Sequence, residues 1–402
     1  MTMAVDKQDK VLNVPNLRFP EYSDKWLECE LQDIADLSKG AGISKDQLSE
    51  TGESCILYGE LYTKYKSEVI STVISKTDIE STNLVRSKAN DVIIPSSGET
   101  AIDISTARCV PYDNILLGGD LNIIRLKNQD GRFFSYQLNG VRKLDIAQIA
   151  QGVSVVHLYG ESLKRLKVRY PSKREQEKIS SLLSAIDDRI ETQSRIINEM
   201  QSLISGITQR ISKHSSVRMV LLSELLVERN EKNTELFPVH SVSVSEGVIN
   251  QIDYLGRSFS AADTSHYNVA HRGDIIYTKS PTGEFPFGIV KRNSVGTNVS
   301  VSPLYGVYKA ISDEVALYIH YYFCSPLNAQ NYLHKLIQKG AKNTINITNQ
   351  RFLENIIPLP DQKTLTGFVK LISAVSAKLK LEKSLLETLQ TQKRYLLTQM
   401  FV

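Results

Sequence analysis

Two stretches about half a chain apart decide the fold: Ile179-Ser-Ser-Leu-Leu-Ser-Ala-Ile-Asp-Asp-Arg-Ile190 and Phe368-Val-Lys-Leu-Ile-Ser-Ala-Val-Ser-Ala-Lys-Leu379. Each apolar residue of the first stretch has an apolar counterpart 189 positions later. The correspondence continues from Ile197, Met200, Ile207 and Ile211 to Leu386, Leu389, Leu396 and Met400. The sequence therefore contains an internal repeat, and a repeat has to be recognised before any other feature is interpreted.

Both copies are heptad patterns, in which apolar residues alternate at intervals of three and four. Each pattern predicts a helix of about 40 residues, which is about 60 Å long at the helical rise. Polar residues interrupt both series, at Gln193, Glu382 and Lys393. We expect the core between the two helices to contain Leu183, Ile186, Ile190, Ile197 and Ile204 from the first copy, and Ile372, Val375, Leu379, Leu386 and Leu389 from the second.

Two arrangements are compatible with these heptads. Each helix could pack on its own domain as an ordinary amphipathic helix. Alternatively, the two helices could cover each other's apolar seams as a coiled coil within the chain. Two matched copies favour the coiled coil, and we favour an antiparallel one because it places the globular parts at opposite ends.

The segments before the helices also correspond. Asp91-Val-Ile-Ile94, followed by Pro95-Ser-Ser-Gly98, resembles Asp274-Ile-Ile-Tyr277, followed by a turn rich in Ser, Thr and Gly. At the same offset of 183, Gly118-Gly-Asp-Leu-Asn-Ile-Ile-Arg125 matches Val301-Ser-Pro-Leu-Tyr-Gly-Val-Tyr308. Short apolar runs that open into turns predict β-strands.

We therefore expect an α+β protein with two similar globular domains, each containing a curved antiparallel sheet and followed by a long helix. Short helices are predicted at Leu31–Leu37 and Glu314–Phe323. The expected order is a lead segment (1–30), a first globular domain (31–171), a first helical spacer (172–216), a second globular domain (217–360) and a second helical spacer (361–402).

The bulk composition describes an ordinary globular chain of 402 residues, with 41% hydrophobic residues, 23% charged residues and a net charge of +4. That charge is too small to indicate DNA binding by itself. The four cysteines form no Cys-x-x-Cys pair, so we interpret them as reduced structural residues. No stretch approaches the roughly 18 apolar residues of a membrane span, and we expect a cytoplasmic protein.

No motif for bond-breaking chemistry is present: the sequence has no phosphate-binding loop, no dinucleotide fingerprint and no paired-histidine metal motif. His266 and His271 are five residues apart, which favours a surface loop over a metal site. Asp91 and Asp274 begin apolar runs without a following Glu-x-Lys, so a turn or strand-capping role is favoured over a nuclease centre. We predict no catalytic residue and no metal site.

Several loops are rich in side chains that bind phosphates and base edges. Lys39-Gly-Ala-Gly-Ile-Ser-Lys45 places glycines between cations, and Tyr58-Gly-Glu-Leu-Tyr-Thr-Lys-Tyr65 interleaves aromatic residues with Lys. A solvated loop is the alternative for each cluster, and only their repetition favours binding. The candidate DNA contacts are Lys39, Tyr58, Tyr62, Thr63, Lys64, Ser96, Ser97, Gly98, Lys279, Ser280, Thr282, Gly283, Lys342 and Asn343.

These residues carry a resemblance to a known family. The opening Val14-Pro-Asn-Leu-Arg-Phe-Pro20 through Trp26 and the run Leu31-Gln-Asp-Ile-Ala-Asp36 resemble the amino-terminal signature of Type I restriction-modification specificity subunits. Lys39-Gly-Ala-Gly-Ile-Ser44 and Tyr58-Gly-Glu-Leu-Tyr-Thr-Lys-Tyr65 do so as well. Pro171-Ser-Lys-Arg-Glu175-Gln176 resembles the start of that family's first helical spacer, and Pro360-Asp-Gln362 resembles the start of the second, without the full Glu-Gln-x-x-Ile pattern.

The resemblance implies a non-catalytic subunit of a restriction-modification complex that binds double-stranded DNA. Its two globular domains would be target recognition domains for the two parts of an asymmetric bipartite site. The implied partners are two methyltransferase subunits, which would methylate adenine at N6, and two restriction and motor subunits. S-adenosylmethionine, ATP and Mg²⁺ would bind to those partners, with no cofactor in this chain. The alternatives are a coiled-coil scaffold that binds only proteins and an unrecognised nuclease.

Overall fold

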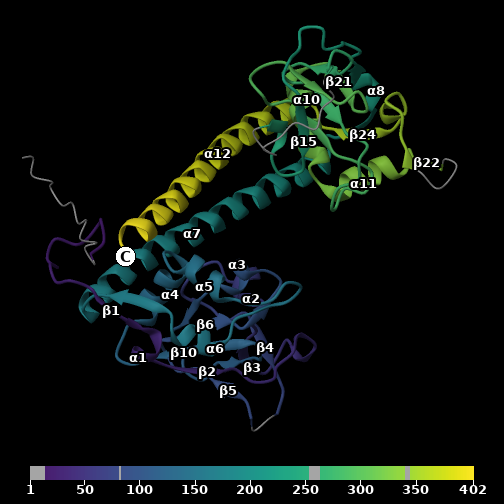
Figure 1. Ribbon diagram of the computed structural model, residues 1–402. Helices are drawn as coiled ribbons and strands as arrows, with labels where there is room; N and C mark the ends of the chain where they lie inside the picture. Colours follow the sequence, from purple (N-terminus) through teal and green to yellow (C-terminus); the bar gives the residue numbers. More distant parts are fainter. Residues whose placement is uncertain (1–13, 81–82, 253–262, 340–344) are drawn as a thin grey trace, which may run out of the picture. The chain divides into compact units, whose positions relative to one another are not determined.

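The computed structural model describes residues 14–80, 83–252, 263–339 and 345–402. The chain forms two compact units, and both long helices contribute to each of them. Unit 1 is Met1–Ser194 with Ser384–Val402, and unit 2 is Arg195–Lys383. The long helices are α7 (Lys173–Ser212, 40 residues) and α12 (Gln362–Gln399, 38 residues), which confirms the two helices expected from the heptads (Figure 1).

Unit 1 is built on an antiparallel sheet with the strand order β2-β10-β6-β8, beside a second sheet with the order β4-β3-β9-β5. A two-stranded ribbon pairs β1, near the amino terminus, with β12, the strand before α7. The strands and helices of unit 1 before α7 are β1 (Leu27–Glu30), α1 (Leu31–Ile34), β2 (Ala35–Lys39), β3 (Glu53–Ile56), α2 (Glu60–Thr63), β4 (Ser75–Thr77), β5 (Val85–Arg86), β6 (Asp91–Pro95), β7 (Ser97–Gly98), α3 (Ala101–Ile104), β8 (Arg108–Val110), β9 (Leu116–Leu117), β10 (Leu121–Leu126), α4 (Gly131–Asn139), α5 (Lys143–Ile149), β11 (Val156–His157), α6 (Gly160–Lys164) and β12 (Lys167–Tyr170).

Unit 2 repeats the same plan. Its four-stranded sheet has the order β14-β21-β18-β19, and the ribbon β13-β24 occupies the place of β1-β12. Its elements are β13 (Arg218–Leu221), α8 (Leu222–Leu225), β14 (Leu226–Glu228), β15 (His240–Ser243), β16 (Gly247–Asn250), β17 (Asn268–Ala270), β18 (Ile275–Tyr277), β19 (Val290–Arg292), β20 (Val299–Val301), β21 (Gly306–Ala310), α10 (Asp313–Phe323), α11 (Pro326–His334), β22 (Gln338–Lys339), β23 (Ile345–Asn346) and β24 (Ile356–Leu359). The α+β fold class is thus confirmed.

Both faces of each central sheet are buried along β6 and β18, which explains why these two strands contain consecutive apolar residues without alternation. In β6, Val92 and Ile94 join the core that contains the helices, whereas Ile93 joins the core between the two sheets. In β18, Ile275 packs toward the helices and Ile276 toward the opposite face.

One short helix differs from the expectation. Leu31–Leu37 was expected to be helical, but α1 ends at Ile34 and β2 begins at Ala35. The backbone of β2 pairs with β10, with Leu37 opposite Ile124. This pairing satisfies backbone hydrogen bonds that a one-turn helix would leave open at its end. The second expected helix agrees with α10, which begins one residue earlier, at Asp313.

The repeat alignment also needs one correction. Val92 pairs with Ile124 in unit 1, whereas its counterpart Ile275 pairs with Tyr308 in unit 2. Tyr308 therefore corresponds to Ile124 and not to Arg125, so β21 is offset from β10 by 184 residues. A shift of one residue exchanges the two faces of a strand, which is why Tyr308 is in the core while Arg125 is not.

The segment at the start of the second long helix also aligns differently with the start of the first. With α7 starting at Lys173 and α12 at Gln362, the counterpart of Gln176 is Leu365 and not Gln362. Gln176 is fully buried, donates to Pro171 O at 2.9 Å and accepts from the backbone of Asp130 at 3.0 Å. Leu365 instead packs in the apolar core of unit 2. One copy therefore anchors its helix by hydrogen bonds and the other by apolar packing.

The core of unit 1 includes the first half of α7 and the end of α12. Its members from the two helices are Ile179, Leu183, Ile186 and Leu396, and Met400, just after α12, joins them. The core of unit 2 combines the opposite ends, since Ile204 of α7 shares it with Leu365, Phe368 and Ile372 of α12. Of the ten expected helix-core residues, Leu183, Ile186, Ile197, Ile204, Ile372 and Leu389 are buried, and Ile190, Val375, Leu379 and Leu386 are partly buried.

Lys393 has a clear structural role although it interrupts a heptad. Its ammonium forms ion pairs with Glu68 and, at 2.5 Å, with Asp187 of α7. All three side chains are at most 13% exposed. The hydroxyl of Tyr136 donates to the same Asp187 at 2.7 Å. Because a buried charge needs partners, this network explains a polar residue in an apolar series.

Candidate nucleic-acid interface

Three loops of unit 1 gather at one edge of the four-stranded sheet. Lys39 ends β2 opposite Asn122, and Pro95 ends β6 opposite Leu121, so both strands end where β10 begins. In an antiparallel sheet the carboxyl ends of the outer strands lie beside the amino end of the middle strand. The segments after Lys39, after Pro95 and before Leu121 therefore lie together, although they are far apart in sequence.

A cavity of about 480 Å³ lies at this edge, between two of the segments that the sequence singled out. From the first segment it is lined by Ile43, Ser44, Lys45 and Leu48, and from the second by Leu57, Tyr58, Gly59, Glu60, Thr63 and Lys64, with Gly119 and Asp120 completing it. The structure thus brings Lys45, Tyr58, Thr63 and Lys64 together. The lining of the cavity combines one aromatic ring, hydroxyls, amines and carboxylates, which suits polar recognition more than the binding of an apolar ligand.

Gly40 is the residue that makes this edge possible. A Cβ atom at Gly40 would lie 2.0 Å from the carbonyl oxygen of Gly118, whereas one at Gly42 would have no atom within 4 Å. The backbone of the first segment therefore touches the turn before β10 at Gly40, and any larger residue there would push the two apart. Gly40 donates its backbone N–H to Leu121 O at 3.0 Å, which fixes the contact.

Tyr62 connects the second loop with the third. Its hydroxyl lies 3.7 Å from the position that a Cβ would take at Gly98. Burial raises the pKa of the Tyr62 phenol, so the hydroxyl stays neutral and able to donate a hydrogen bond. A Cβ on Gly98 would also lie 2.5 Å from Ile104 Cγ2, so this position requires glycine.

In the loop 58–65, the lysine and the threonine that were expected to bind phosphate already have partners within the protein. Lys64 donates to Glu60 Oε1 at 2.7 Å, and Thr63 donates to Gly59 O at 2.7 Å. Glu60 is buried, so its carboxylate depends on the Lys64 charge. Lys39 and Lys45 are exposed and lie at the two ends of the glycine-containing segment 39–45. These two lysines are therefore better placed for phosphate than Lys64.

Burial argues against two of the candidate contacts. Ser96 and Ser97 are 6% and 8% exposed. The backbone N–H of Ser96 donates to Asp120 O at 2.7 Å, and Ser97 pairs with His157 between β7 and β11. Their short polar side chains allow tight packing at the edge rather than reaching outward. The sequence cannot distinguish these roles, because a serine suits both.

In unit 2 the candidate loop follows β18, at the edge equivalent to the end of β6. Ser280, Thr282 and Gly283 are exposed, and Lys279 is half-buried. Burial lowers the pKa of the Lys279 ammonium, and the carboxylate of Glu228 opposes this effect. Thr282 and Phe285 exchange both backbone hydrogen bonds, which closes the turn. Lys342 and Asn343 lie outside the described residues.

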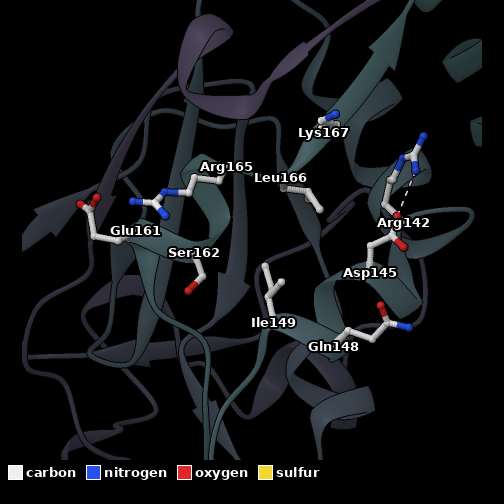
Figure 2. Close-up of a pocket in the computed structure, with 9 residues that line it drawn as sticks. All are labelled: Arg142, Asp145, Gln148, Ile149, Glu161, Ser162, Arg165, Leu166 and Lys167. Carbon is white, nitrogen blue, oxygen red and sulfur yellow. Dashed lines mark hydrogen bonds and ion pairs between the residues drawn. The ribbon is translucent and has the colours of Figure 1, made fainter.

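A second cavity of unit 1, of about 610 Å³, was not anticipated from the sequence. Figure 2 shows the residues that line it, which come from α5, α6, β12 and the residues beside them and include Arg142, Arg165 and Lys167. Arg142 pairs with Asp145 at 3.0 Å and donates to Val402 O at 2.8 Å. Acidic Glu161 also lines the cavity, so its charge is mixed. No local sequence pattern marks these residues, because three separate elements supply them.

Within the part of the chain that the structure describes, neither a metal site nor a membrane span stands out. Among the described residues, no three His, Cys, Asp or Glu side chains are grouped in a way that could hold a metal ion. No described helix is sufficiently long and apolar to cross a membrane. His271, which the sequence placed in a surface loop, donates a hydrogen bond from Nε2 to Glu231 Oε2 at 2.8 Å.

Asp91 and Asp274 have the turn role that the sequence favoured. The carboxylate of each accepts the backbone N–H of the residue three positions earlier, Lys88 or His271, at 2.8 Å. The residue just before each aspartate has a positive φ, of 80° and 93°. Both carboxylates are thereby engaged at the start of a strand and away from the edge that carries the candidate contacts.

Comparison with known proteins gives a consistent result. Residues 23–202 match a family model described as the Type I restriction modification DNA specificity domain. A crystal structure of a Type-I restriction-modification system S subunit from M. genitalium covers 97% of this chain and 99% of its own, with a TM-score of 0.63 and 16% sequence identity. A chain from a structural study of type I R-M complex assembly and conformational transition covers 94% of this chain and 97% of its own, with a TM-score of 0.52 and 12% identity.

At such low identities the two solved structures establish the likeness of fold, and the family model adds the sequence signature. That signature covers unit 1 from the strand ribbon to the middle of α7. Residues 23–202 of this chain are thus similar to Type I restriction modification DNA specificity domains, and the chain shares its fold with the two solved structures.

Proposed function

We propose that this chain is the specificity subunit of a Type I restriction-modification complex and that it reads an asymmetric, bipartite DNA sequence. One observation carries the proposal: the two units share a strand order, while the loops at the equivalent sheet edge differ. A common scaffold with unlike loops suits two readers of unlike half-sites. The edge with Lys39, Lys45, Tyr58 and Tyr62 reads one half-site, and the loop Lys279–Gly283 reads the other.

The two long helices act as a spacer, paired as an antiparallel coiled coil. The pairing of opposite helix ends within each unit supports this direction, since the start of α7 shares a core with the end of α12 and the end of α7 shares one with the start of α12. A rigid rod fixes the distance between the base pairs that are read, as half-site spacing does in dimeric DNA-binding proteins, where one DNA turn is about 34 Å.

The chemistry belongs to partner subunits. Two methyltransferase subunits, with S-adenosylmethionine, flip an adenine out of the duplex and methylate N6, while this chain holds the DNA in register. Two restriction and motor subunits use ATP and Mg²⁺. This chain supplies recognition without catalysis and works in the cytoplasm. A protein-binding scaffold and a nuclease are the competing functions. DNA binding with a methyltransferase partner excludes the scaffold, and Mg²⁺-dependent cleavage by the purified chain alone would favour the nuclease.

A domain exchange tests whether each unit recognises one half of a bipartite DNA site. Residues 31–160 are replaced by the corresponding segment of a relative, and methylated adenines are mapped across a genome that carries the chimera and the methyltransferase subunit. We expect one half of the recognised sequence to change while the other half and the spacer stay. Replacement of residues 217–358 is the reciprocal experiment. If either exchange alters both halves, the modular reading is wrong.

A point variant tests the sheet edge of unit 1. Lys45→Ala should weaken duplex binding similarly for all sequences and lower the slope of affinity against salt by about one ion. Lys127→Ala is the matched control, because Lys127 follows the far end of β10 and its ion pair with Asp36 is exposed. Equal effects of the two substitutions on the salt slope would exclude the edge as the DNA-binding surface.

A further inference from the structure

A cavity of about 680 Å³ in unit 2 includes a cysteine in its lining. It lies among α10, β19, the turn between β15 and β16, and the parts of α7 and α12 that belong to this unit. Cys324 lines the cavity and is half-buried. The cavity is independent of the sheet edge proposed to bind DNA, and the inference does not rest on that proposal.

Two side chains direct positive charge and a hydrogen bond at the sulfur. The Lys291 ammonium lies 3.4 Å from Cys324 Sγ, and His320 Nε2 lies 3.8 Å from it. The backbone N–H of Arg292 donates to His320 Nδ1 at 3.1 Å, so Nε2 carries the hydrogen and faces the sulfur. The geometry is that of a thiolate held between a cation and an imidazole N–H.

The burial of Lys291 is a second, independent sign. It is only 5% exposed, and among the described residues no carboxylate lies within ion-pair distance of its ammonium. A buried ammonium without an anion is costly, and an anionic sulfur relieves that cost. Arg108 occupies the same strand position in unit 1, but there the guanidinium donates to the backbone carbonyls of Leu61 and Tyr65 at 3.0 and 2.9 Å.

The remaining charged groups around the cavity are mostly cationic. Arg292 comes from β19 and is ion-paired with Asp313, and Lys380 and Lys383 come from α12. Among the described residues of the lining, the acidic one is Glu246, from the turn after β15, and its carboxylate is 4.0 Å from the Lys383 ammonium. Tyr321 also lines the cavity, and burial raises its pKa, so it stays neutral. The field in the cavity therefore favours anions.

The other three cysteines lack this environment. Burial raises the pKa of Cys55 to about 11 and that of Cys109 to about 12, and it also raises the pKa of Cys29. For Cys324 burial has the same direction, but His320 and Lys291 more than offset it and lower the pKa to about 6. Cys29 is half-buried like Cys324, so the chain contains its own control for accessibility.

We propose that Cys324 is a site of covalent modification, at which the thiolate reacts with small disulfides that carry carboxylates. The Cys324 sulfur attacks one sulfur of the reagent, a new S–S bond forms and the reagent's S–S bond breaks. The electron pair of that bond leaves with the second sulfur as a thiolate. Cys324 is oxidised to a mixed disulfide, the departing sulfur is reduced, and no other reactant is needed.

The pH profile distinguishes this thiol from an ordinary one. At pH 6 about half of a thiol with a pKa near 6 is ionised, compared with well under 1% of an ordinary thiol of pKa about 8.5. The lower basicity makes the thiolate about tenfold less nucleophilic, so the net advantage at pH 6 is about tenfold. At pH 8.5 the order is reversed, and the ordinary thiol reacts faster.

The full chain is treated with a dicarboxylated aryl disulfide, 5,5′-dithiobis(2-nitrobenzoate), and in parallel with uncharged dithiodipyridine. Released thiol gives the rate, and peptide mass spectrometry gives the modified residue. At pH 6 we expect the label on Cys324, about tenfold faster than on the same cysteine in the urea-unfolded chain, and a preference for the carboxylated reagent that weakens with salt. Cys324→Ser should abolish this reaction and Cys29→Ser should leave it unchanged.

Lys291→Met tests the cause, with circular dichroism as the check on folding. We expect a severalfold slower reaction at pH 6 and a reduced preference for the carboxylated reagent. If the label falls on Cys29 at pH 6, or if the Cys324 rate keeps rising tenfold per pH unit up to pH 8, the proposal is overturned. Equal rates with both reagents would overturn its selectivity for carboxylates.

Discussion

Single glycines and lysines decide whether the sheet edge of unit 1 and its helix contacts form at all. Gly40 allows the first loop to touch the turn before β10, and Lys393 joins α12 to α7 and to the globular part of unit 1. For each of them, the same loop or helix contains a second residue of the same type that does not make these contacts. Gly42 and Lys378 therefore serve as matched controls for the next two predictions.

Gly40→Ala should destabilise unit 1 and weaken DNA binding. The added methyl group overlaps the carbonyl oxygen of Gly118, and overpacking of this kind costs about 1–3 kcal/mol. Gly42→Ala should be neutral or stabilising by up to about 1 kcal/mol, because it meets open space and restricts the unfolded chain. Urea unfolding and duplex titration measure the two effects. Equal behaviour of the two variants would contradict the close approach.

Lys393→Met should lower the free energy of unfolding of unit 1 by about 3–5 kcal/mol, because it leaves Glu68 and Asp187 buried without their cation. Lys378→Met, in the part of the same helix that belongs to unit 2, removes a lysine that is 65% exposed and should leave the unfolding of unit 1 unchanged. Thermal and urea unfolding give the comparison. A small effect of Lys393→Met would mean that the network is solvated.

At the scale of elements, β6 and β18 begin with the same turn but use different arginines. Arg125, from β10, binds Asp91 through Nε and Nη2 at 2.8 and 2.7 Å. Arg229, which follows β14, binds Asp274 through Nε at 2.6 Å. The carboxylate is thus common to both units, while its cation comes from a different strand.

Asp91→Asn should loosen β6, and Asp274→Asn should loosen β18. Each substitution removes a buried, charge-assisted hydrogen-bond acceptor, at a cost of about 1–3 kcal/mol. Hydrogen exchange should therefore quicken in the sheet of the altered unit and stay unchanged in the other unit. Asp36→Asn, at an exposed pair, is the control. Faster exchange in both units would show that they do not unfold independently.

At the scale of the whole molecule, the proposed function makes the helix length a determinant of the DNA sequence that is read. Deleting seven residues from each helix, 194–200 and 382–388, preserves the heptad phase and shortens a paired rod by about 10 Å. That is about three base pairs at 3.4 Å each. We expect the uncontacted spacer to shorten by about this amount while both half-sites persist, as read from a map of methylated adenines.

The control deletes seven residues from one helix alone. This leaves the two seams of unequal length, so we expect loss of folding or of methylation rather than a new spacer. An unchanged spacer in the double deletion would contradict the role of the helices as a measuring rod and would leave the assignment of the half-sites untouched.

The sheet edge illustrates how far the sequence alone could lead. It predicted loops with DNA-binding character at 39–45 and 58–65, and the structure brings parts of both into one cavity. It also offered Ser96, Ser97 and Lys64, which the structure shows to be buried or already paired. Residue type indicates which contacts a side chain can make, but the partner that occupies it depends on the neighbouring segments.

By itself, the sequence determined the two long helices, the α+β repeat and the turns at Asp91 and Asp274, because periodic apolar spacing and short turn motifs are local and survive in any context. Only the tertiary structure decided that Lys393 meets Glu68, that Leu365 replaces Gln176, and that Lys291 and His320 face Cys324. These depend on strand register and helix packing between residues far apart in the chain, where a shift of one position exchanges a buried side chain for an exposed one.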